Sequence, residues 1–222
     1  MRHAARFFVV ITFLLIAPSA FGQALSWSTP VSNNSAIQPV GGTSGRNGVA
    51  TATFNNEVWA AYATTTCTAD NNTDCYLVVA HNTGGAGTTF ENSALVNVSP
   101  IGYAAANTNP ALIAANGRLW LAWNTATGEH YIASSADGLN WTTLGNIIGV
   151  ASTVYSPSFA VNPSNPTILY IGYMDATYYT PVLCTYDTTN NNNQSCQSLT
   201  GLRSMNFNPG MAFFNGLLYM GF

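Results

Sequence analysis

The chain has 222 residues, of which 47% are hydrophobic and only 6% are charged, and its formal net charge is −3. So little charge leaves no basic surface to neutralise phosphates, which excludes a nucleic-acid partner, and an aromatic content of 12% excludes a disordered tail. The scarcity of Glu and the absence of Lys exclude a helical bundle, and the abundance of Thr, Val, Tyr and Asn-Gly favours β structure.

The N-terminus has the pattern of a secretory signal peptide. Arg2 and Arg6 stand before an apolar run from Phe7 to Ala17, and small residues follow that run. A run of about 11 residues is too short for a transmembrane helix, which needs about 20. We therefore expect residues 1–22 to be cleaved, and the mature protein to be secreted or periplasmic with no membrane attachment.

Four aromatic segments recur along the chain and predict a repeated strand. They begin 61, 50 and 49 residues apart, at Trp59, Trp120, Tyr170 and Tyr219. Each alternates large and small side chains, which is typical of a strand packed between two layers. A nine-residue insertion containing Cys67 and Cys75 accounts for the longer first spacing. Such periods in an all-β chain predict propeller blades; the alternative, an ordinary β-sandwich, would not explain the repeated register.

A second repeated strand precedes each aromatic segment. Pro110–Gly117 matches Pro209–Gly216, and the same place is held by Gly48–Asn56 and Pro157–Asn165. Asn-Gly at the end of the first two segments predicts a two-residue type I′ hairpin, because that turn needs positive φ at both positions. Each unit is therefore expected to contain three or four antiparallel strands over roughly 50 residues.

The four cysteines form two local pairs, Cys67 with Cys75 and Cys184 with Cys196. Secreted chains oxidise such pairs, and closeness in sequence favours these two disulfides among three connectivities. A zinc site is the alternative, but the cysteine spacing and the lack of a neighbouring His fit zinc poorly. We expect two disulfides, no metal and no other cofactor.

The segment Ser135-Ala-Asp137-Gly138-Leu-Asn-Trp141 resembles an Asp-box of the form S-x-D-G-x-x-W. This hairpin motif, also called a BNR repeat, marks the sialidase-like β-propellers. In it the Asp accepts backbone N–H groups of its own turn, the Gly supplies positive φ and the Trp caps the blade core. Thr83–Phe90 and Thr185–Asp187 resemble degraded copies.

The resemblance covers residues 45–222 and leaves residues 23–44 as a lead-in segment. It implies an all-β fold, a partial β-propeller of about three and a half four-stranded blades, truncated at the C-terminus. Asp-boxes are structural and occur in enzymes and in binding proteins, so they indicate fold rather than function.

In sialidases of this class three arginines hold the substrate carboxylate, an Asp is the acid, and a Tyr with a Glu partner is the nucleophile. The resemblance implies that Arg46 is the first arginine and that Asp70 is the acid. Arg203, before the fourth unit, is a further candidate for contact with a ligand at a central site, although its offset from Pro209 does not match that of Arg46. The family places its Tyr and Glu in later blades, and no such pair is found at those positions here. The same resemblance therefore implies an incomplete catalytic set.

Two further polar or aromatic pairs are candidates for contact with a ligand. Tyr178 and Tyr179 follow Asp175 and have the character of an exposed pair that stacks on a sugar ring, although blade packing fits them equally. Glu129-His130 is expected to form a cross-strand polar pair, and the alternative is a catalytic dyad. We predict a non-catalytic or incomplete glycan-binding propeller with a glycan or glycoprotein ligand; the alternative is the N-terminal part of a sialidase-like exo-glycosidase.

Overall fold

The computed structural model describes the chain in ten segments, all in the second of two compact units, residues 1–32 and 33–222. The described residues are 48–67, 74–81, 91–95, 103–105, 109–125, 127–146, 155–175, 178–190, 194–201 and 208–221. Every regular element among them is a β-strand, which confirms the predicted all-β class. Within these segments no helix is long and apolar enough to cross a membrane. The proposed signal peptide lies outside them.

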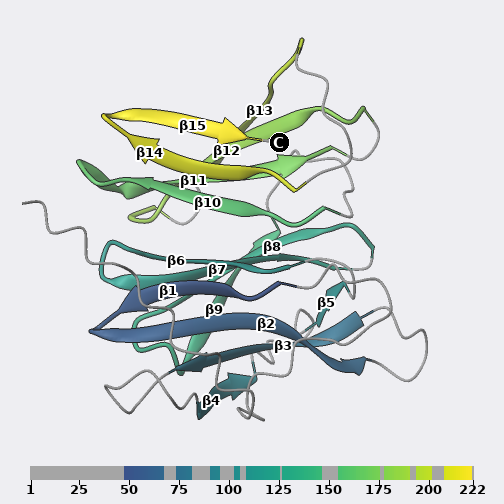
Figure 1. The fold of residues 1–222 in the computed structure, drawn as a ribbon, viewed down its shortest axis with the longest axis vertical. Helices are drawn as coiled ribbons and strands as arrows, with labels where there is room; N and C mark the ends of the chain where they lie inside the picture. Colours follow the sequence, from purple (N-terminus) through teal and green to yellow (C-terminus); the bar gives the residue numbers. More distant parts are fainter. Residues whose placement is uncertain are drawn as a thin grey trace, which may run out of the picture. The chain divides into compact units, whose positions relative to one another are not determined.

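The strands pair antiparallel in chain order and form four sheets (Figure 1). The first sheet contains β1 (Ala50–Phe54), β2 (Glu57–Cys67), β3 (Asp74–His81), β4 (Glu91–Leu95) and β5 (Tyr103–Ala105). The second contains β6 (Ala111–Ala115), β7 (Arg118–Asn124), β8 (His130–Ser135) and β9 (Trp141–Asn146). The third contains β10 (Ser158–Asn162), β11 (Asn165–Met174), β12 (Pro181–Asp187) and β13 (Gln194–Ser198). The fourth is the hairpin of β14 (Gly210–Phe214) and β15 (Leu217–Gly221).

The meander of four strands confirms the predicted four-stranded antiparallel unit, with one difference. In the first sheet, the four strands β1-β2-β3-β4 pair in chain order, and a fifth strand, β5, also pairs with β3. It pairs with the first residues of β3, Asp74 to Tyr76, whereas β4 pairs with the later residues of the same strand. A long third strand therefore accommodates two short partners along one edge, which the sequence repeat did not predict.

The two predicted type I′ turns are present. Asn116 and Gly117 have φ angles of 48° and 69°, and Asn215 and Gly216 have 49° and 75°. Asn55 and Asn56 form the equivalent turn of the first sheet, with φ of 51° and 63°. Asn is among the few non-glycine residues that adopt this conformation readily.

The aromatic repeat lies in the second strand of every sheet, as predicted. Two of its members make the same bond: the Trp59 indole N–H donates to the carbonyl of Phe54 (3.2 Å), and that of Trp120 donates to the carbonyl of Ala115 (3.0 Å). This equivalence of Phe54 and Ala115 corrects the register of the first unit by one residue, so that Val49, not Gly48, holds the place of Pro110.

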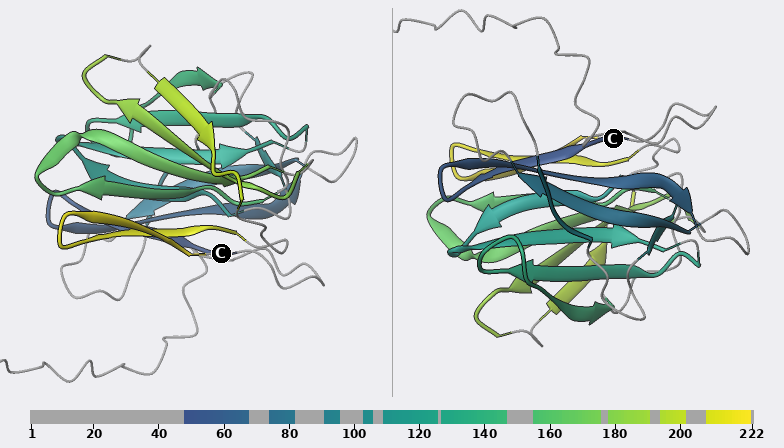
Figure 2. Two further views of the ribbon diagram at one scale, coloured as in Figure 1. Left: turned by 90° about the horizontal axis from the view of Figure 1, so that it is seen from above. Right: turned by 90° about the horizontal axis from the view of Figure 1, so that it is seen from below.

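The core consists of apolar layers between consecutive sheets. Figure 2 shows the sheets from two further sides. Between the first and second sheets the largest buried side chains include Trp59, Leu121 and Trp123. Between the second and third they include Trp120 and Tyr173. Small residues such as Ala61 and Gly172 lie among the large ones on these strands, so one sheet face fits closely against the next.

Candidate functional site

A chain of hydrogen bonds joins the four sheets at the residues that lead into their first strands. The backbone N–H of Gly48 donates to the Asn109 side-chain oxygen, and the N–H of Asn109 donates to the Ser156 hydroxyl (2.6 Å). The N–H of Ser156 then donates to the Asn208 side-chain oxygen (2.8 Å). Each donor stands two residues before its strand, so the bonds link equivalent positions. We call this set the inter-sheet relay.

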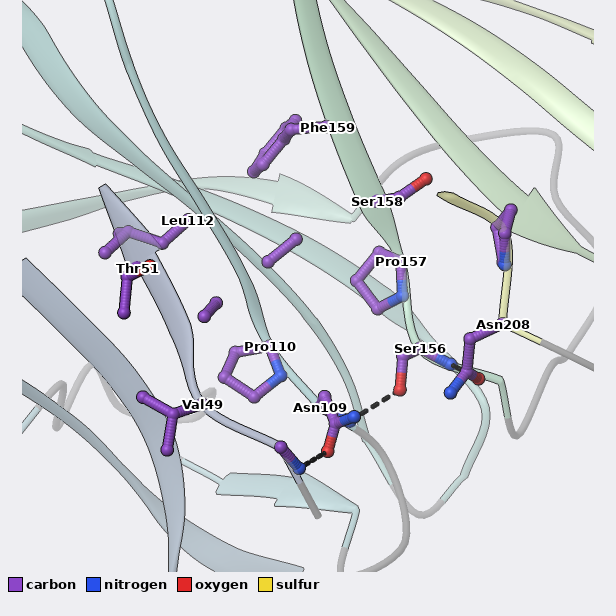
Figure 3. A pocket seen from close by; sticks show the side chains of 14 residues that line it. Val49, Thr51, Asn109, Pro110, Leu112, Ser156, Pro157, Ser158, Phe159 and Asn208 are labelled. Atoms are coloured by element: carbon purple, nitrogen blue, oxygen red, sulfur yellow. Dashed lines mark hydrogen bonds between the residues drawn. The ribbon is translucent and has the colours of Figure 1, made fainter. Parts of the chain in front are cut away.

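The relay borders an open pocket of about 350 Å³, which we call the inner-strand pocket (Figure 3). All four sheets line it, each with the residues at the start of its first strand. The polar lining consists of hydroxyl and amide side chains, and the apolar lining includes three prolines. The lining residues are Gly48, Val49, Ala50, Thr51, Asn109, Pro110, Ala111, Leu112, Ser156, Pro157, Ser158, Phe159, Asn208 and Pro209. None of these side chains carries a formal charge.

One polar atom at the pocket lacks a partner. Among the described residues, the Ser158 hydroxyl makes no hydrogen bond although it is buried. A buried polar group without a partner costs free energy, and in native proteins such groups are nearly always paired. This hydroxyl lies behind the pocket wall, beside Gly172, rather than in the open part of the pocket.

The connections between second and third strands lie at the same edge of the sheets as this pocket. In the third sheet Ser158, at the start of β10, pairs with Gly172, near the end of β11. The chain leaving β11 therefore emerges beside the pocket end of β10. In the first and second sheets, β2 and β7 end, and β3 and β8 begin, at the same edge of their own sheets. The pocket and the described β11–β12 connection thus share one edge, and residues at such an edge are suited to binding.

Tyr178 and Tyr179 lie in the β11–β12 connection and are exposed, to 73% and 46%. The Asp175 carboxylate accepts the Tyr178 N–H (3.1 Å), and the Asp175 N–H donates to the Thr180 carbonyl (2.9 Å). Tyr179 has a φ of 51°, a strained conformation for an aromatic residue. The connection thus holds both rings outward, and neither packs into a blade core. Exposed aromatic faces and stored backbone strain are both features of binding sites.

A buried polar network lies where β7 ends and β8 begins. His130 hydrogen-bonds through Nδ1 with the Asn124 side-chain oxygen, and the Asn124 amide donates to the Tyr155 carbonyl. The His130 ring also contacts the buried ring of Tyr173, with centroids 4.1 Å apart. Burial raises the pKa of the Tyr173 hydroxyl well above its ordinary value. Asn124 and His130 are cross-strand partners, whereas Glu129 is exposed and bonds Thr127 and Tyr131, so the predicted Glu129-His130 unit separates into two environments.

The turn from Ser135 to Trp141 has its own dense hydrogen bonding, at the opposite edge of the second sheet. The Asp137 carboxylate accepts the N–H groups of Leu139 and Asn140 (both 2.8 Å), and the Trp141 indole donates to the carbonyl of Gly138 (2.9 Å). The Ser135 hydroxyl accepts the Gly138 N–H (2.7 Å). The hydrogen bonds to the carboxylate hold the pKa of Asp137 well below its ordinary value, and those from Asn140 make the largest contribution.

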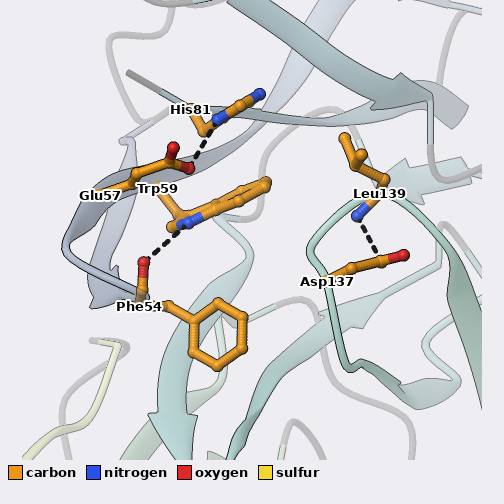
Figure 4. Close-up of polar contacts among 6 residues, drawn as sticks. All are labelled: Phe54, Glu57, Trp59, His81, Asp137 and Leu139. Carbon is orange, nitrogen blue, oxygen red and sulfur yellow. Dashed lines mark hydrogen bonds and ion pairs between the residues drawn. The ribbon is translucent and has the colours of Figure 1, made fainter. Parts of the chain in front are cut away.

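The same turn contacts the first sheet through its glycine. The six-membered ring of Trp59 lies directly against Gly138. The indole also stacks on His81, with ring centroids 4.4 Å apart (Figure 4). The Glu57 carboxylate hydrogen-bonds with Nδ1 of His81 (2.8 Å). Asp187 ends β12 in a comparable turn, where the hydroxyl and N–H of Thr189 lower its pKa. These turns organise the blades and lie away from the pocket.

The outcome for the other predicted residues is mixed. Cys184 and Cys196 form a disulfide between β12 and β13, as predicted. Cys67 and Cys75 are register partners on β2 and β3, and their side chains lie outside the described part. Arg46, Asp70 and Arg203 also lie outside it, so their predicted roles stay predictions.

The relay residues are the functional candidates that the sequence analysis missed. Asn109, Ser156 and Asn208 each stand directly before a proline. A short polar residue followed by proline, repeated once per unit, is the signal that would have found them.

No protein-family model matches the sequence, and no curated protein matches it. Solved structures resemble the fold at 13% identity. The GH43 endo-arabinanase from Bacillus licheniformis aligns with a TM-score of 0.57 over 85% of this chain and 66% of its own length. The α-L-arabinofuranosidase Arb93A from Fusarium graminearum, solved with an iminosugar inhibitor, gives 0.55 over 78% and 54%. Trypanosoma rangeli sialidase gives 0.50 over 78% and 27%.

The chain thus spans less than two thirds of the length of each of these structures. Identity this low establishes the fold alone. The antiparallel meanders, the repeated inner-strand positions and these likenesses together show that the chain has the sialidase-like β-propeller fold.

Proposed function

We propose that this chain is a glycan-binding propeller module whose ligand occupies the inner-strand pocket. The observation that carries the proposal is the chemistry of the lining: amide and hydroxyl groups beside prolines and Phe159, with no formal charge. Sugars present hydroxyl groups on their rims and C–H groups on their faces, so they need polar groups and apolar surfaces together. An uncharged lining favours a neutral sugar over an anionic one, because nothing in it compensates a carboxylate.

Three features near the pocket support this assignment. The side-chain amides of Asn109 and Asn208 line the pocket and offer the kind of polar group that sugar hydroxyls bind. Tyr178 and Tyr179 are exposed at the same edge of the third sheet and present rings on which a sugar face stacks. The structures that share the fold include an arabinanase, an arabinofuranosidase bound to an iminosugar and a sialidase, all proteins that act on sugars.

A second candidate function is that of an exo-glycosidase of which this chain is the N-terminal part. One observation favours it: Gly48 lines the pocket, and Arg46 precedes it by two residues in the chain. Asp70 belongs to the β2–β3 connection, between Cys67 and Asp74. On this hypothesis Arg46 binds a substrate carboxylate and Asp70 is the acid, with Arg203 as a further contact. Hydrolysis of this type also needs a nucleophile opposite the acid.

A glycan array distinguishes the two functions when it is combined with an activity assay. The binding function predicts retention of neutral oligosaccharides and no turnover of a fluorogenic sialoside by the 222-residue chain. Turnover that disappears in both Arg46→Ala and Asp70→Asn would favour the enzyme instead. Failure to retain any neutral glycan would contradict the binding function.

We also propose the processing and motif assignments that the sequence predicts. Residues 1–22 are a signal peptide, residues 23–44 a lead-in segment, and residues 45–222 the propeller. The turn at Asp137 belongs to the Asp-box type, with Ser135, Gly138 and Trp141 in their motif positions. N-terminal sequencing of the exported protein tests the first assignment, since a start near residue 23 is expected and an intact Met1 would contradict it.

A further inference from the structure

The side chains of the inter-sheet relay all serve as acceptors. The side-chain oxygen of Asn109 accepts the N–H of Gly48, and that of Asn208 accepts the N–H of Ser156. Between them, the Ser156 hydroxyl accepts the N–H of Asn109. An asparagine side chain has an oxygen that accepts and an NH2 group that donates. The relay therefore fixes how each amide is turned, with the oxygen toward the backbone of the preceding sheet and the NH2 group away from it.

The hydrogens of these three side chains are not used within the described segments. There, neither Nδ2 of Asn109, nor Nδ2 of Asn208, nor the Ser156 hydroxyl donates a hydrogen bond. All three residues line the inner-strand pocket, and they lie together along one border of it (Figure 3). This border therefore offers hydrogen-bond donors to a ligand, while its acceptors are already bonded to the backbone.

Gly48 leaves room for one of these donors. A Cβ atom added to Gly48 would lie 3.0 Å from Nδ2 of Asn109, so the NH2 group occupies space that a side chain would crowd. Asn109 is half-buried and Asn208 is exposed. Both NH2 groups are thus within reach of a molecule in the pocket.

A border that donates and carries no charge selects among the groups that a sugar can present. A carbonyl oxygen only accepts, and its two lone pairs can receive two hydrogens at once. A hydroxyl also donates, and it needs an acceptor that this border has already used. An ammonium group only donates and fits worst. A carboxylate accepts, but nothing in the lining compensates its charge. The best match is a neutral group with a carbonyl oxygen.

The acetamido group of an N-acetylated sugar has this chemistry. Its amide carbonyl is a stronger acceptor than the carbonyl of an acetyl ester, and its methyl group needs an apolar contact. Pro157 and Pro209 directly follow Ser156 and Asn208 in the chain, and both prolines line the pocket. Apolar surface therefore lies beside the donors, where it can cover the methyl group.

We propose that the inner-strand pocket binds neutral sugars through an acetamido group, with Asn109 and Asn208 as the specificity-determining residues. Their NH2 groups and the Ser156 hydroxyl donate to the acetamido carbonyl, and the prolines contact its methyl group. This inference rests on the proposed glycan-binding function and narrows the class of its ligand.

Calorimetric titration of the full chain with three β1,4-linked disaccharides tests the proposal. The sugars differ at C2: N,N′-diacetylchitobiose carries acetamido groups, cellobiose carries hydroxyls, and the deacetylated chitobiose carries ammonium groups. The wild type is expected to bind diacetylchitobiose at least about tenfold more tightly than cellobiose, the size of effect that one hydrogen bond produces. The ammonium sugar is expected to bind most weakly.

Two variants test the assigned residues without removing the relay. Asn109→Asp and Asn208→Asp each keep an oxygen for the backbone N–H and replace the NH2 group by a second oxygen. Each variant is expected to lose the preference for diacetylchitobiose and to bind the ammonium sugar at least about tenfold more tightly than the wild type does, because a carboxylate pairs with ammonium. Asn190→Asp adds the same charge at an exposed turn at the opposite edge of the third sheet, and it should keep the wild-type order.

The outcomes separate this inference from the proposed function. Equal affinity of the wild type for diacetylchitobiose and cellobiose would overturn the acetamido assignment and leave glycan binding intact. Binding of an arabino-oligosaccharide without binding of diacetylchitobiose would do the same. A preference for diacetylchitobiose that survives in both Asp variants would overturn the role of Asn109 and Asn208. Only the loss of every neutral sugar would contradict the proposed function itself, and this inference with it.

Discussion

A Cβ atom added to Gly138 would lie 2.1 Å from the Cη2 atom of the Trp59 ring, so the indole occupies the space of a side chain. Gly138 also has a φ of 78°, which L side chains rarely adopt. Two requirements, a positive φ and a close approach of the neighbouring sheet, thus meet at one residue of the Asp137 turn.

Gly138→Ala is expected to lower the free energy of unfolding by about 3 kcal/mol, since overpacking adds to the cost of a left-handed backbone. Gly216→Ala is the matched control: its φ is 75° but its surroundings are open. The control should lose only about 1 kcal/mol in urea denaturation. Equal losses in the two variants would show that the Trp59 contact contributes nothing.

The depressed pKa of Asp137 predicts a dependence of stability on pH. The carboxylate accepts hydrogen bonds only in the folded state, so its contribution is present above its ordinary pKa of 3.8 and is lost as the pH falls through the folded pKa. Unfolding measured between about pH 5 and pH 2 should become easier with acid in the wild type.

Asp137→Asn should flatten that dependence, because an amide does not titrate. The change should be modest, since the group is exposed and solvent screens it. Asp187 has a pKa shifted in the same direction, so the double variant with Asp187→Asn should be flatter still. A wild-type slope retained in the double variant would place the acid sensitivity elsewhere.

Because Ser156 belongs to the inter-sheet relay, replacing this small residue is expected to lower the stability of the fold. Ser156→Ala removes the acceptor of the Asn109 N–H and leaves that donor unpaired. A loss of about 1–3 kcal/mol in the free energy of unfolding is expected, the usual cost of a stranded donor. Ser156→Thr keeps the hydroxyl and should retain most of the stability. If Ser156→Thr loses as much free energy of unfolding as Ser156→Ala, the effect comes from packing rather than from the hydrogen bond.

The Cys184–Cys196 disulfide joins register partners on β12 and β13. Replacing both residues by alanine should lower the free energy of unfolding by about 2–3 kcal/mol, through the freedom that the unfolded chain regains. Denaturant titration of the wild type in the presence of a reducing agent should show a similar loss in the free energy of unfolding. No change in the midpoint would show that the strands hold this edge unaided.

The sequence predicted those parts of the fold that local chemistry determines. Asn116-Gly117 encodes its own turn, and the aromatic repeat marks the second strand of every sheet, because both depend on neighbouring residues alone. The first unit was displaced by one residue, since Asn55-Asn56 lacks the glycine that normally marks a type I′ turn.

The candidate site was harder to predict because its residues come from four sheets. Asn109, Ser156 and Asn208 are unremarkable in sequence and gain their role only when the first strands begin side by side. The strain at Tyr179 likewise depends on the bonds of Asp175 and Thr180. Residues that are far apart in sequence and meet only in the folded chain cannot be recognised from their sequence neighbours, apart from the polar residue before proline that recurs in these units.

The central claim is that the inner-strand pocket binds a neutral glycan, and calorimetric titration with a neutral arabino-oligosaccharide tests it most directly. Thr51→Trp fills the pocket from an exposed lining position, and Asn190→Trp places the same side chain at an exposed turn at the opposite edge of the third sheet. Binding should persist in the wild type and in Asn190→Trp and weaken at least about tenfold in Thr51→Trp, a change of about 1.4 kcal/mol. Sialyllactose should bind more weakly than the neutral sugar in every case. Neutral-sugar affinity equal in all three proteins, or a preference for sialyllactose, would contradict the account.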